Sequence, residues 1–243
     1  MRIDVALTAN AAGAMKLAGA SVIVIDVLRA STSIITALIN GCEAVVPVAT
    51  AEEAHQRAAA LPAGAVLIAG ERRGEPLAGF DLGNSPLDFT VERVSGKTLI
   101  MTTSNGTQAL LAARGAAAIG VAGLVNLSAA AAWAMAAERH IAILCAGERG
   151  ARSLEDVVCA GLLVERMKTA EPGVQLGPAA AEAAATARPY AKDVARLRAA
   201  SSWARHLVRS GRGADVDACL AIDTTTLVPV FLPDVDKVVS GPR

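Results

Sequence analysis

Seven short apolar runs, separated by stretches of helical character, are the feature that most constrains the fold of this chain. The runs cover residues 3–7, 21–27, 43–48, 65–69, 97–103, 116–122 and 140–145 and consist mostly of Val, Ile and Leu. Continuous runs of this kind are typical of strands that are buried on both faces. Helical patterns lie between most of them, at residues 31–40, 50–61, 107–114 and 128–139. This alternation predicts an α/β fold with a largely parallel sheet flanked by helices.

The pattern changes near residue 150. Residues 154–221 are almost wholly helical in character, and short apolar runs follow near 228–231 and 236–239. This change predicts that a second subdomain or a helical cap begins near residue 150. Residues 1–150 form an N-terminal subdomain with the main phosphate and metal motifs, and residues 151–243 form a helix-rich C-terminal subdomain that packs against it.

The composition argues against nucleic acid and membranes as partners. The 23 basic residues balance 23 acidic ones, and 2 Trp, 1 Tyr and 3 Phe leave few side chains to stack on bases. Residues 115–137 lack charge, but they are mostly Ala and Gly and are interrupted at Asn126 and Ser128, which predicts a strand and a helix rather than a membrane span. The chain starts without an apolar signal segment, so we expect a cytoplasmic protein. The apolar composition is compatible with a homo-oligomer.

The first polar motif belongs to the run at 21–27. Residues 22–33 read VIVIDVLRASTS, a strand that leads into Asp26, Arg29 and the hydroxyls of Ser31 and Thr32 at the start of a helix. A helix start presents free N–H groups to an anion, Arg29 adds a planar fork for phosphate or sulfonate oxygens, and Asp26 is placed to hold a cation or to transfer a proton. In a purely structural alternative, Ser31 or Thr32 caps the helix and Asp26 pairs with Arg29.

The second motif is a long loop at residues 70–86, which reads GERRGEPLAGFDLGNSP. It combines the carboxylates of Glu71 and Asp81 with arginines, small hydrogen-bonding side chains and glycines that permit close backbone approach. Loops of this length in compact domains are usually functional or disordered, and this composition favours an ordered functional loop. Oxygen ligands favour Mg²⁺ or Mn²⁺, whereas the scattered 4 Cys and 3 His argue against zinc. The alternative is a solvated loop with an ordinary turn at 84–86.

Two further polar groups stand at predicted helix starts. Residues 99–107 read LIMTTSNGT, so a strand again ends in hydroxyls, an amide and a glycine before a helix. This pattern is compatible with a second phosphate cradle or with Thr107 as a simple cap, and it is neither a P-loop nor a dinucleotide fingerprint. Ser153, Glu155 and Asp156 form a capping-like group at the start of the helical region.

A short sequence occurs twice. Residues 67–72 read LIAGER and residues 144–149 read LCAGER, and both place AGER at the end of a predicted strand. Chance in an Ala-rich chain and an ancient duplication both explain the repetition.

Taken together and in this order, the motifs at 26–32, at 70–72 with 79–86, and at 102–107 resemble those of the 2-phosphosulfolactate phosphatase family, the ComB-like proteins. Residues 146–161 are similar to the later motif of the family, and Gly211, Asp215, Cys219 and Pro229 fit its C-terminal end more loosely. The resemblance covers nearly the whole chain. One departure is Ser104, where a third Thr is common in the family, and the hydroxyl is retained.

The resemblance implies a Mg²⁺-dependent phosphatase, with Mn²⁺ as the alternative metal. Its implied substrate is a small anionic ester, (2R)-2-phospho-3-sulfolactate or a related phosphorylated 2-hydroxy acid. The products are (2R)-3-sulfolactate and phosphate, and the reaction is a step in coenzyme M biosynthesis. The resemblance also implies an α/β fold built as two subdomains.

From chemical type, we expect the metal ligands to be Asp26, Glu71 and Asp81. The expected catalytic residues are Asp26, Arg29, Glu71, Asp81, Glu155 and Asp156. Of these, Asp156 or Glu155 positions the water or protonates the leaving oxygen. The expected substrate-binding residues are Ser31, Thr32, Arg72, Arg73, Asn84, Ser85, Thr103, Ser104, Asn105, Gly106 and Thr107. One of Arg29, Arg72 and Arg73 holds the carboxylate or sulfonate.

Two other functions fit the same residues. A non-catalytic sensor of a small phosphorylated or sulfonated acid would use the same anion sites, although its acidic cluster repels an anionic ligand unless a cation intervenes. A phosphatase that forms an aspartyl-phosphate at Asp26 would be similar to haloacid-dehalogenase-like enzymes, but Leu28 stands at the second acidic position of their D-x-D motif. Three observations distinguish these functions. Metal-dependent turnover indicates the metal-dependent phosphatase, binding without turnover indicates the sensor, and a trapped covalent phosphate indicates the aspartyl-phosphate mechanism.

Overall fold

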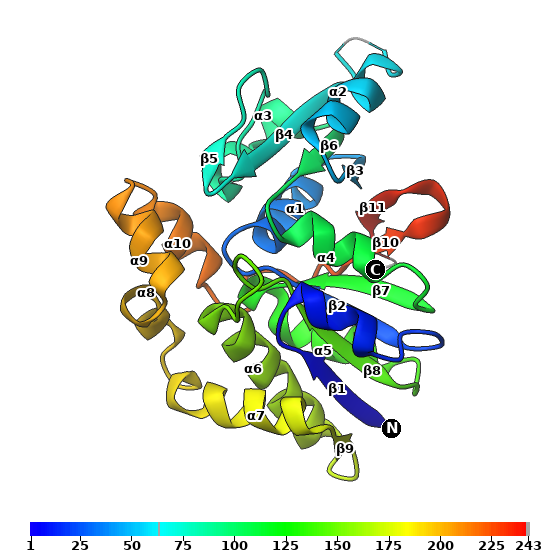
Figure 1. The fold of residues 1–243 in the computed structure, drawn as a ribbon, viewed down its shortest axis with the longest axis vertical. Coiled ribbons are helices and arrows are strands. Elements are labelled where there is room, and N and C mark those ends of the chain that lie inside the picture. Colours follow the sequence, from blue (N-terminus) through cyan, green and yellow to red (C-terminus); the bar gives the residue numbers. More distant parts are fainter. Residues whose placement is uncertain (63, 242–243) are drawn as a thin grey trace.

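The fold is an α/β structure built on one mixed sheet, as expected from the sequence. A computed structural model describes residues 1–62 and 64–241, and its strands follow the order β5-β4-β6-β3-β11-β10-β7-β2-β8-β1-β9 (Figure 1). The strands are β1 (Arg2–Ala6), β2 (Ser21–Ile25), β3 (Ala44–Pro47), β4 (Val66–Arg72), β5 (Glu75–Pro76), β6 (Thr98–Thr102), β7 (Ala118–Ala122), β8 (Ile141–Cys145), β9 (Gln175–Leu176), β10 (Pro229–Leu232) and β11 (Lys237–Ser240).

Helices connect and cover these strands. The α-helices are α1 (Ala30–Ile39), α2 (Ala51–Ala59), α3 (Val91–Val94), α4 (Gly106–Ala112), α5 (Leu127–Met135), α6 (Leu154–Ala170), α7 (Pro178–Ala187), α8 (Leu197–Ala200), α9 (Ser202–Arg209) and α10 (Gly213–Cys219). Short 3-10 helices include η1 (Ala9–Ala14) and η2 (Pro86–Asp88). No helix in the described part of the chain is long and apolar enough to cross a membrane.

The sheet contains two groups of parallel strands that run in opposite directions. One group is β4-β6-β3 and the other is β7-β2-β8-β1-β9. The hairpin β10–β11 joins them, and it pairs antiparallel with β7 on one side and with β3 on the other. Three successive antiparallel pairings therefore separate β3 from β7, which reverses the direction of one group relative to the other.

The strand β2 shows why the apolar runs are continuous. Its side chains at Ile23 and Ile25 pack into the core that contains α5, α6 and α7, whereas Val22 and Val24 pack into the core that contains α1 and α4. All five residues of β2 are buried. A strand with a core on each face has no solvent side, so alternation with polar residues is absent.

The helices α1 and α4 lie between the two strand groups, and this arrangement brings the carboxyl ends of β2 and β6 together (Figure 1). At Gly106, the first residue of α4, the backbone of this helix comes closest to Asp26 and to the start of α1. A Cβ added there would lie 2.6 Å from Asp26 Oδ2 and 2.6 Å from the Ala30 Cβ. Asp26 and the motif that precedes α4 therefore share one site.

Three features differ from the pattern expected from the sequence. The strand expected at 65–69 continues to Arg72 and returns as β5, so the loop at 70–86 begins as a hairpin. The helical region 154–221 also contains the short strand β9, which pairs with β1 at the sheet edge. The C-terminal strands lie in the middle of the sheet, a position that the sequence pattern did not specify. The division near residue 150 stays a prediction.

The helices α6 and α7 pack unusually closely because small residues form their interface. A Cβ added at Gly161 of α6 would lie 2.1 Å from the Ala183 carbonyl oxygen and 2.6 Å from the Ala187 Cβ. Both of these partners belong to α7 and are fully buried. The glycine is thus required by the distance between the two helices.

We expect the substitution Gly161→Ala to lower the free energy of unfolding by about 3 kcal/mol, because the new methyl group forces the helices apart. Urea denaturation followed by circular dichroism measures this change. Gly13→Ala is the matched control, since nothing lies within 4 Å of the added Cβ. Equal unfolding midpoints for the two variants would contradict the close packing of α6 on α7.

Candidate active site

A cavity of about 730 Å³ opens where the carboxyl ends of β2 and β6 meet. The chain segments that follow β2, β4, β6 and β8 line it, together with Trp203 of α9. Its charged lining residues are Asp26, Arg29, Glu71, Arg72, Arg73, Glu148 and Arg149, and its polar lining residues include Asn84, Thr103, Ser104, Asn105 and Gln108. The cavity thus combines carboxylates with a larger number of guanidinium groups.

Asp26 is a buried carboxylate directly after β2. Its Oδ1 accepts the N–H of Ala30 at 3.3 Å, and its own N–H donates to Ser31 Oγ at 2.9 Å. Burial, and then the charge of Glu71, raises the pKa of Asp26 to about 7 from an ordinary value of 3.8. A carboxyl group with such a pKa changes its charge near neutral pH, which is typical of active sites.

Glu71 holds the hairpin β4–β5 against the segment that precedes α4. Its carboxylate accepts the N–H of Gly74 at 2.6 Å and the N–H of Ser104 at 2.8 Å. The side chain is buried and also lines the cavity. Each carboxylate oxygen has more than one lone pair, so Glu71 retains acceptor capacity toward the cavity.

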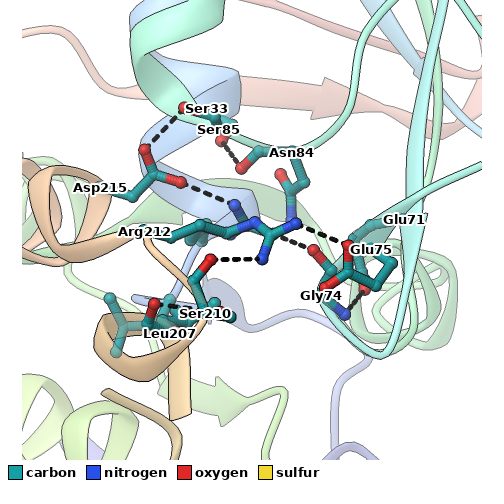
Figure 2. A network of polar contacts seen from close by, with 12 residues as sticks. Ser33, Glu71, Gly74, Glu75, Asn84, Ser85, Leu207, Ser210, Arg212 and Asp215 are labelled. Atoms are coloured by element: carbon teal, nitrogen blue, oxygen red, sulfur yellow. Dashed lines mark hydrogen bonds and ion pairs between the residues drawn. The ribbon is translucent and has the colours of Figure 1, made fainter. Parts of the chain in front are cut away.

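Arg29 is fixed by a second carboxylate from the C-terminal helices. Its guanidinium forms an ion pair with Asp215 at 2.7 Å and donates to the Gly74 carbonyl oxygen at 2.9 Å. Asp215 also accepts the hydroxyl of Ser85 at 2.7 Å, and Figure 2 shows this contact beside the hairpin that contains Gly74. The contacts of Arg29 and Asp215 therefore join the end of β2, the loop at 70–86 and the helix α10.

Arg72 and Asn84 complete the wall on the side of the long loop. The guanidinium of Arg72 donates to the Glu71 carbonyl oxygen at 2.8 Å and to Thr102 Oγ1 at 2.9 Å, so protein acceptors already occupy much of it. Asn84 is buried, and its side-chain oxygen has no hydrogen-bond partner within residues 1–62 and 64–241. An orphaned buried oxygen at a cavity wall is a candidate ligand atom.

Several of the predicted substrate-binding hydroxyls bond the backbone, and those of Ser31, Thr32 and Thr107 do not line the cavity. The hydroxyl of Thr32 donates to the Val27 carbonyl oxygen at 3.4 Å, and Ser31 accepts the Asp26 N–H, so neither lines the cavity. Thr107 and Thr103 bond each other, since each hydroxyl accepts the other's N–H at 3.0 Å. The capping alternative is not met either, because the N-cap residues are Arg29 of α1 and Asn105 of α4, and neither helix has a side-chain cap hydrogen bond.

The two acidic residues at the start of α6 lie behind the cavity, along a small adjoining void that they share with Asp26. Both oxygens of Asp156 accept backbone N–H groups, from Val27 at 2.8 Å and from Gly147 at 3.0 Å. Burial raises the pKa of Asp156 and of Glu155, and in Asp156 the charge of Asp26 adds to the effect. The carboxyl groups of Asp26, Glu155 and Asp156 therefore form a cluster that binds protons more tightly than exposed carboxylates.

Asp81 and Ser85 lie outside the cavity lining. The exposed Asp81 uses its carboxylate to accept the N–H of Ile68 at 2.8 Å, which fastens the loop to β4. The structure therefore does not bring the three predicted metal ligands Asp26, Glu71 and Asp81 together, because Asp81 lies outside the cavity that Asp26 and Glu71 line. Ser85 contributes only indirectly, through its bond to Asp215.

Sequence reasoning missed four residues of the site. Glu148 and Arg149 line the cavity, and the repeated AGER sequence marked their position without suggesting a role. Trp203 lines the cavity and donates from Nε1 to the Leu28 carbonyl oxygen at 3.0 Å. Asp215 appeared only as a loose match of the family resemblance. No local signal links positions 203 and 215 to Asp26, because their proximity arises only in the folded chain.

The donor atoms of the cavity fit a small, hard cation. Mg²⁺ prefers oxygen ligands, usually keeps several waters and takes one or two protein carboxylates. Asp26 and Glu71 offer two carboxylates, and Asn84 offers the orphaned side-chain oxygen. Across the described residues, no three His, Cys, Asp or Glu side chains gather as a complete ligand set. The residues present therefore fit a metal that shares its coordination with water and a substrate oxygen.

Comparison with known proteins identifies the class of this chain. A model of the family "2-phosphosulpholactate phosphatase" matches residues 7–233. A protein of Symbiobacterium thermophilum is 40% identical over 222 residues, which is 91% of this chain and 95% of the relative. Proteins of Thermotoga petrophila and of Synechococcus sp. strain CC9605 are 39% and 41% identical, each over 214 residues. These alignments cover 86% and 85% of this chain and 88% and 87% of the two relatives.

All three relatives have the name "Probable 2-phosphosulfolactate phosphatase". The chain is accordingly an enzyme of the phosphoric monoester hydrolase class. It belongs to the 2-phosphosulfolactate phosphatase family, and the resemblance seen in its motifs is confirmed.

The raised pKa of Asp26 predicts a pH-dependent stability. Well below pH 3.8 the carboxyl group is neutral in both the folded and the unfolded state. As the pH rises from 3.8 through about 7, the unfolded chain releases the proton more readily, so the folded state loses stability. We compare the free energies of unfolding of chelator-treated wild type and Asp26→Asn. At pH 8 the variant should be more stable by up to about 4 kcal/mol, and at pH 4 the difference between the two proteins should be small.

Urea denaturation at a series of pH values measures this difference. Asp88→Asn is the control, because Asp88 is exposed. A constant difference between wild type and Asp26→Asn from pH 4 to pH 8 would contradict the raised pKa.

Proposed function

We propose that the cavity hydrolyses the phosphate ester of (2R)-2-phospho-3-sulfolactate, or of a closely related phosphorylated 2-hydroxy acid, in a Mg²⁺-dependent reaction. The products are (2R)-3-sulfolactate and phosphate. One observation carries the proposal: Asp26, a carboxyl group with a pKa of about 7, stands in a cavity with Glu71 and several arginines. The names of the relatives supply the substrate.

The chemistry needs charge compensation more than covalent help from the protein. A phosphoryl group in transfer spreads its negative charge over its oxygens, and catalysis depends on positioning and on neutralising that charge. Asp26, Glu71 and Asn84 are the groups that hold Mg²⁺, which when bound supplies positive charge at the phosphoryl oxygens. The guanidinium groups supply the rest, and Arg29 is held in place for this role by Asp215.

Proton transfer is assigned to the acidic cluster behind Asp26. The leaving oxygen of the ester needs a proton, and the attacking water must lose one. Glu155 lies with Asp26 along the small void, and its raised pKa lets it hold a proton at a higher pH than an exposed glutamate. Asp156 is a positioning residue, since its two oxygens already hold the backbone at Val27 and Gly147.

Phosphate binding at the first turn of α1 is not part of the proposal. The N–H groups of Ala30 and Ser31 bond the side chain and the carbonyl oxygen of Asp26, and the N–H of Ser33 bonds the Arg29 carbonyl oxygen. Anion binding is assigned instead to the arginines and to the polar groups of residues 103–105 that line the cavity. A step in coenzyme M biosynthesis and a cytoplasmic setting belong to the same proposal.

Phosphate release from racemic phosphosulfolactate, phospholactate and an aryl phosphate, with Mg²⁺ and with chelator, tests the activity. We expect metal-dependent turnover that is fastest with the sulfonated ester. Asp26→Asn should lower kcat/KM by about 100-fold or more and weaken the dependence on Mg²⁺, because the variant loses a charge that holds the metal. Asp88→Asn should leave both unchanged.

Other outcomes would replace the proposal. Saturable binding of sulfolactate without turnover of any ester would favour the sensor function. A covalent phosphate trapped on Asp26 would favour the aspartyl-phosphate mechanism. An Asp26→Asn variant with unchanged kcat and unchanged metal dependence would remove Asp26 from the centre of the reaction.

A further inference from the structure

Two hairpins of the same construction contribute to the cavity wall. In the first, Arg72 pairs with Glu75, and Arg73 and Gly74 form the tip. In the second, Glu148 pairs with Ala151 through two backbone hydrogen bonds of 2.9 and 2.8 Å, and Arg149 and Gly150 form the tip. Both tips have the sequence Arg-Gly. The first hairpin follows β4, which pairs with β6, the strand before α4. The second follows β8, which pairs with β2, the strand before α1.

The same short segment anchors both tips. The N–H of Arg73 donates to Ser104 Oγ at 3.2 Å, and the N–H of Arg149 donates to Asn105 Oδ1 at 3.4 Å. Ser104 and Asn105 are consecutive and line the cavity. Both hairpin tips are therefore anchored to the segment that precedes α4.

An arginine is an unfavourable residue at each tip. The φ angles are +56° at Arg73 with +85° at Gly74, and +51° at Arg149 with +78° at Gly150. A two-residue turn with positive φ at both positions favours Asn or Asp at the first, since other side chains meet a steric cost there. Strained residues that occur at a functional site are commonly retained for their side chains.

These two arginines differ from the other two in the cavity. Arg29 is buried and bonds Asp215 and Gly74, and Arg72 bonds Glu71 and Thr102. The guanidinium groups of Arg73 and Arg149 have no hydrogen-bond or ion-pair partner among residues 1–62 and 64–241, and both residues are exposed on the cavity wall. They are the cations that remain available to a ligand.

We propose that Arg73 and Arg149 form a matched pair that binds the two non-reacting anionic groups of the substrate, one arginine to each group. The inference rests on the proposed function and narrows its substrate class to phosphate esters that carry two further anionic groups. A guanidinium fork suits both a carboxylate and a sulfonate. The phosphoryl group then lies between the tips, toward Asp26 and Glu71.

Arg73→Gln and Arg149→Gln test the pair, with Arg188→Gln as the control for the loss of one exposed charge outside the cavity. With phosphosulfolactate, each cavity variant should lower kcat/KM by about 10- to 100-fold, because a charge-assisted hydrogen bond is lost. With an aryl phosphate, which lacks both remote anions, each variant should lower kcat/KM by a clearly smaller factor than with phosphosulfolactate, and an equal loss with both substrates would contradict the pair. With phospholactate, which lacks the sulfonate, only the variant of the carboxylate-binding arginine should lose activity.

Binding of sulfolactate by calorimetry gives a readout that is independent of turnover. We expect Kd to rise by about tenfold or more in each cavity variant and to stay constant in Arg188→Gln. Wild-type turnover of phosphosulfolactate with unchanged kinetics and binding in both variants would overturn the inference and leave the proposed function intact. Absence of turnover in the wild type would remove the proposed function, and the calorimetric comparison alone would then decide the inference.

Discussion

The buried ion pair of Arg29 and Asp215 is the interaction on which the site depends. Both side chains are less than a tenth exposed. Removing one partner from such a pair typically costs about 3–5 kcal/mol, because the other charge stays buried without compensation. Through this pair and the bonds to Gly74 and Ser85, the helix α10 is tied to the end of β2 and to the long loop. Helices late in the chain are thus structural parts of a cavity whose reactive groups come from early strands.

A second constraint is the crowding of carboxyl groups at Asp26. Burial and mutual repulsion make ionisation of Asp26, Glu155 and Asp156 unfavourable, and the hydrogen bonds that these carboxylates accept offset the effect only in part. Such an arrangement lowers stability at neutral pH, where Asp26, with a pKa of about 7, exchanges its proton. A bound cation removes part of the repulsion, so the same cluster favours metal binding when it is ionised.

The sequence predicted the strands well and the site only partly. Buried parallel strands such as β2 have continuous apolar runs, so their positions and the α/β class follow from local pattern. The antiparallel position of β10 and β11 in the middle of the sheet depends on long-range pairing, which no local pattern specifies. The residues around Asp26 and Glu71 were found because they follow strands. Ser31 was assigned to the ligand, but its hydroxyl accepts a backbone N–H, and Trp203 was missed because only tertiary packing brings it to the cavity.

The position of the hairpin β10–β11 has a consequence for how the molecule assembles. Every principal strand of the two parallel groups is complete by residue 145, yet the strands that join those groups are residues 229–240. Before this late segment emerges during synthesis, the two groups are connected through α1 and α4 but not by strand pairing. Contacts between residues far apart in sequence form slowly because loop closure costs entropy. The strand pairing that closes the sheet is consequently among the last features of the fold to form, and a chain interrupted before residue 229 lacks it.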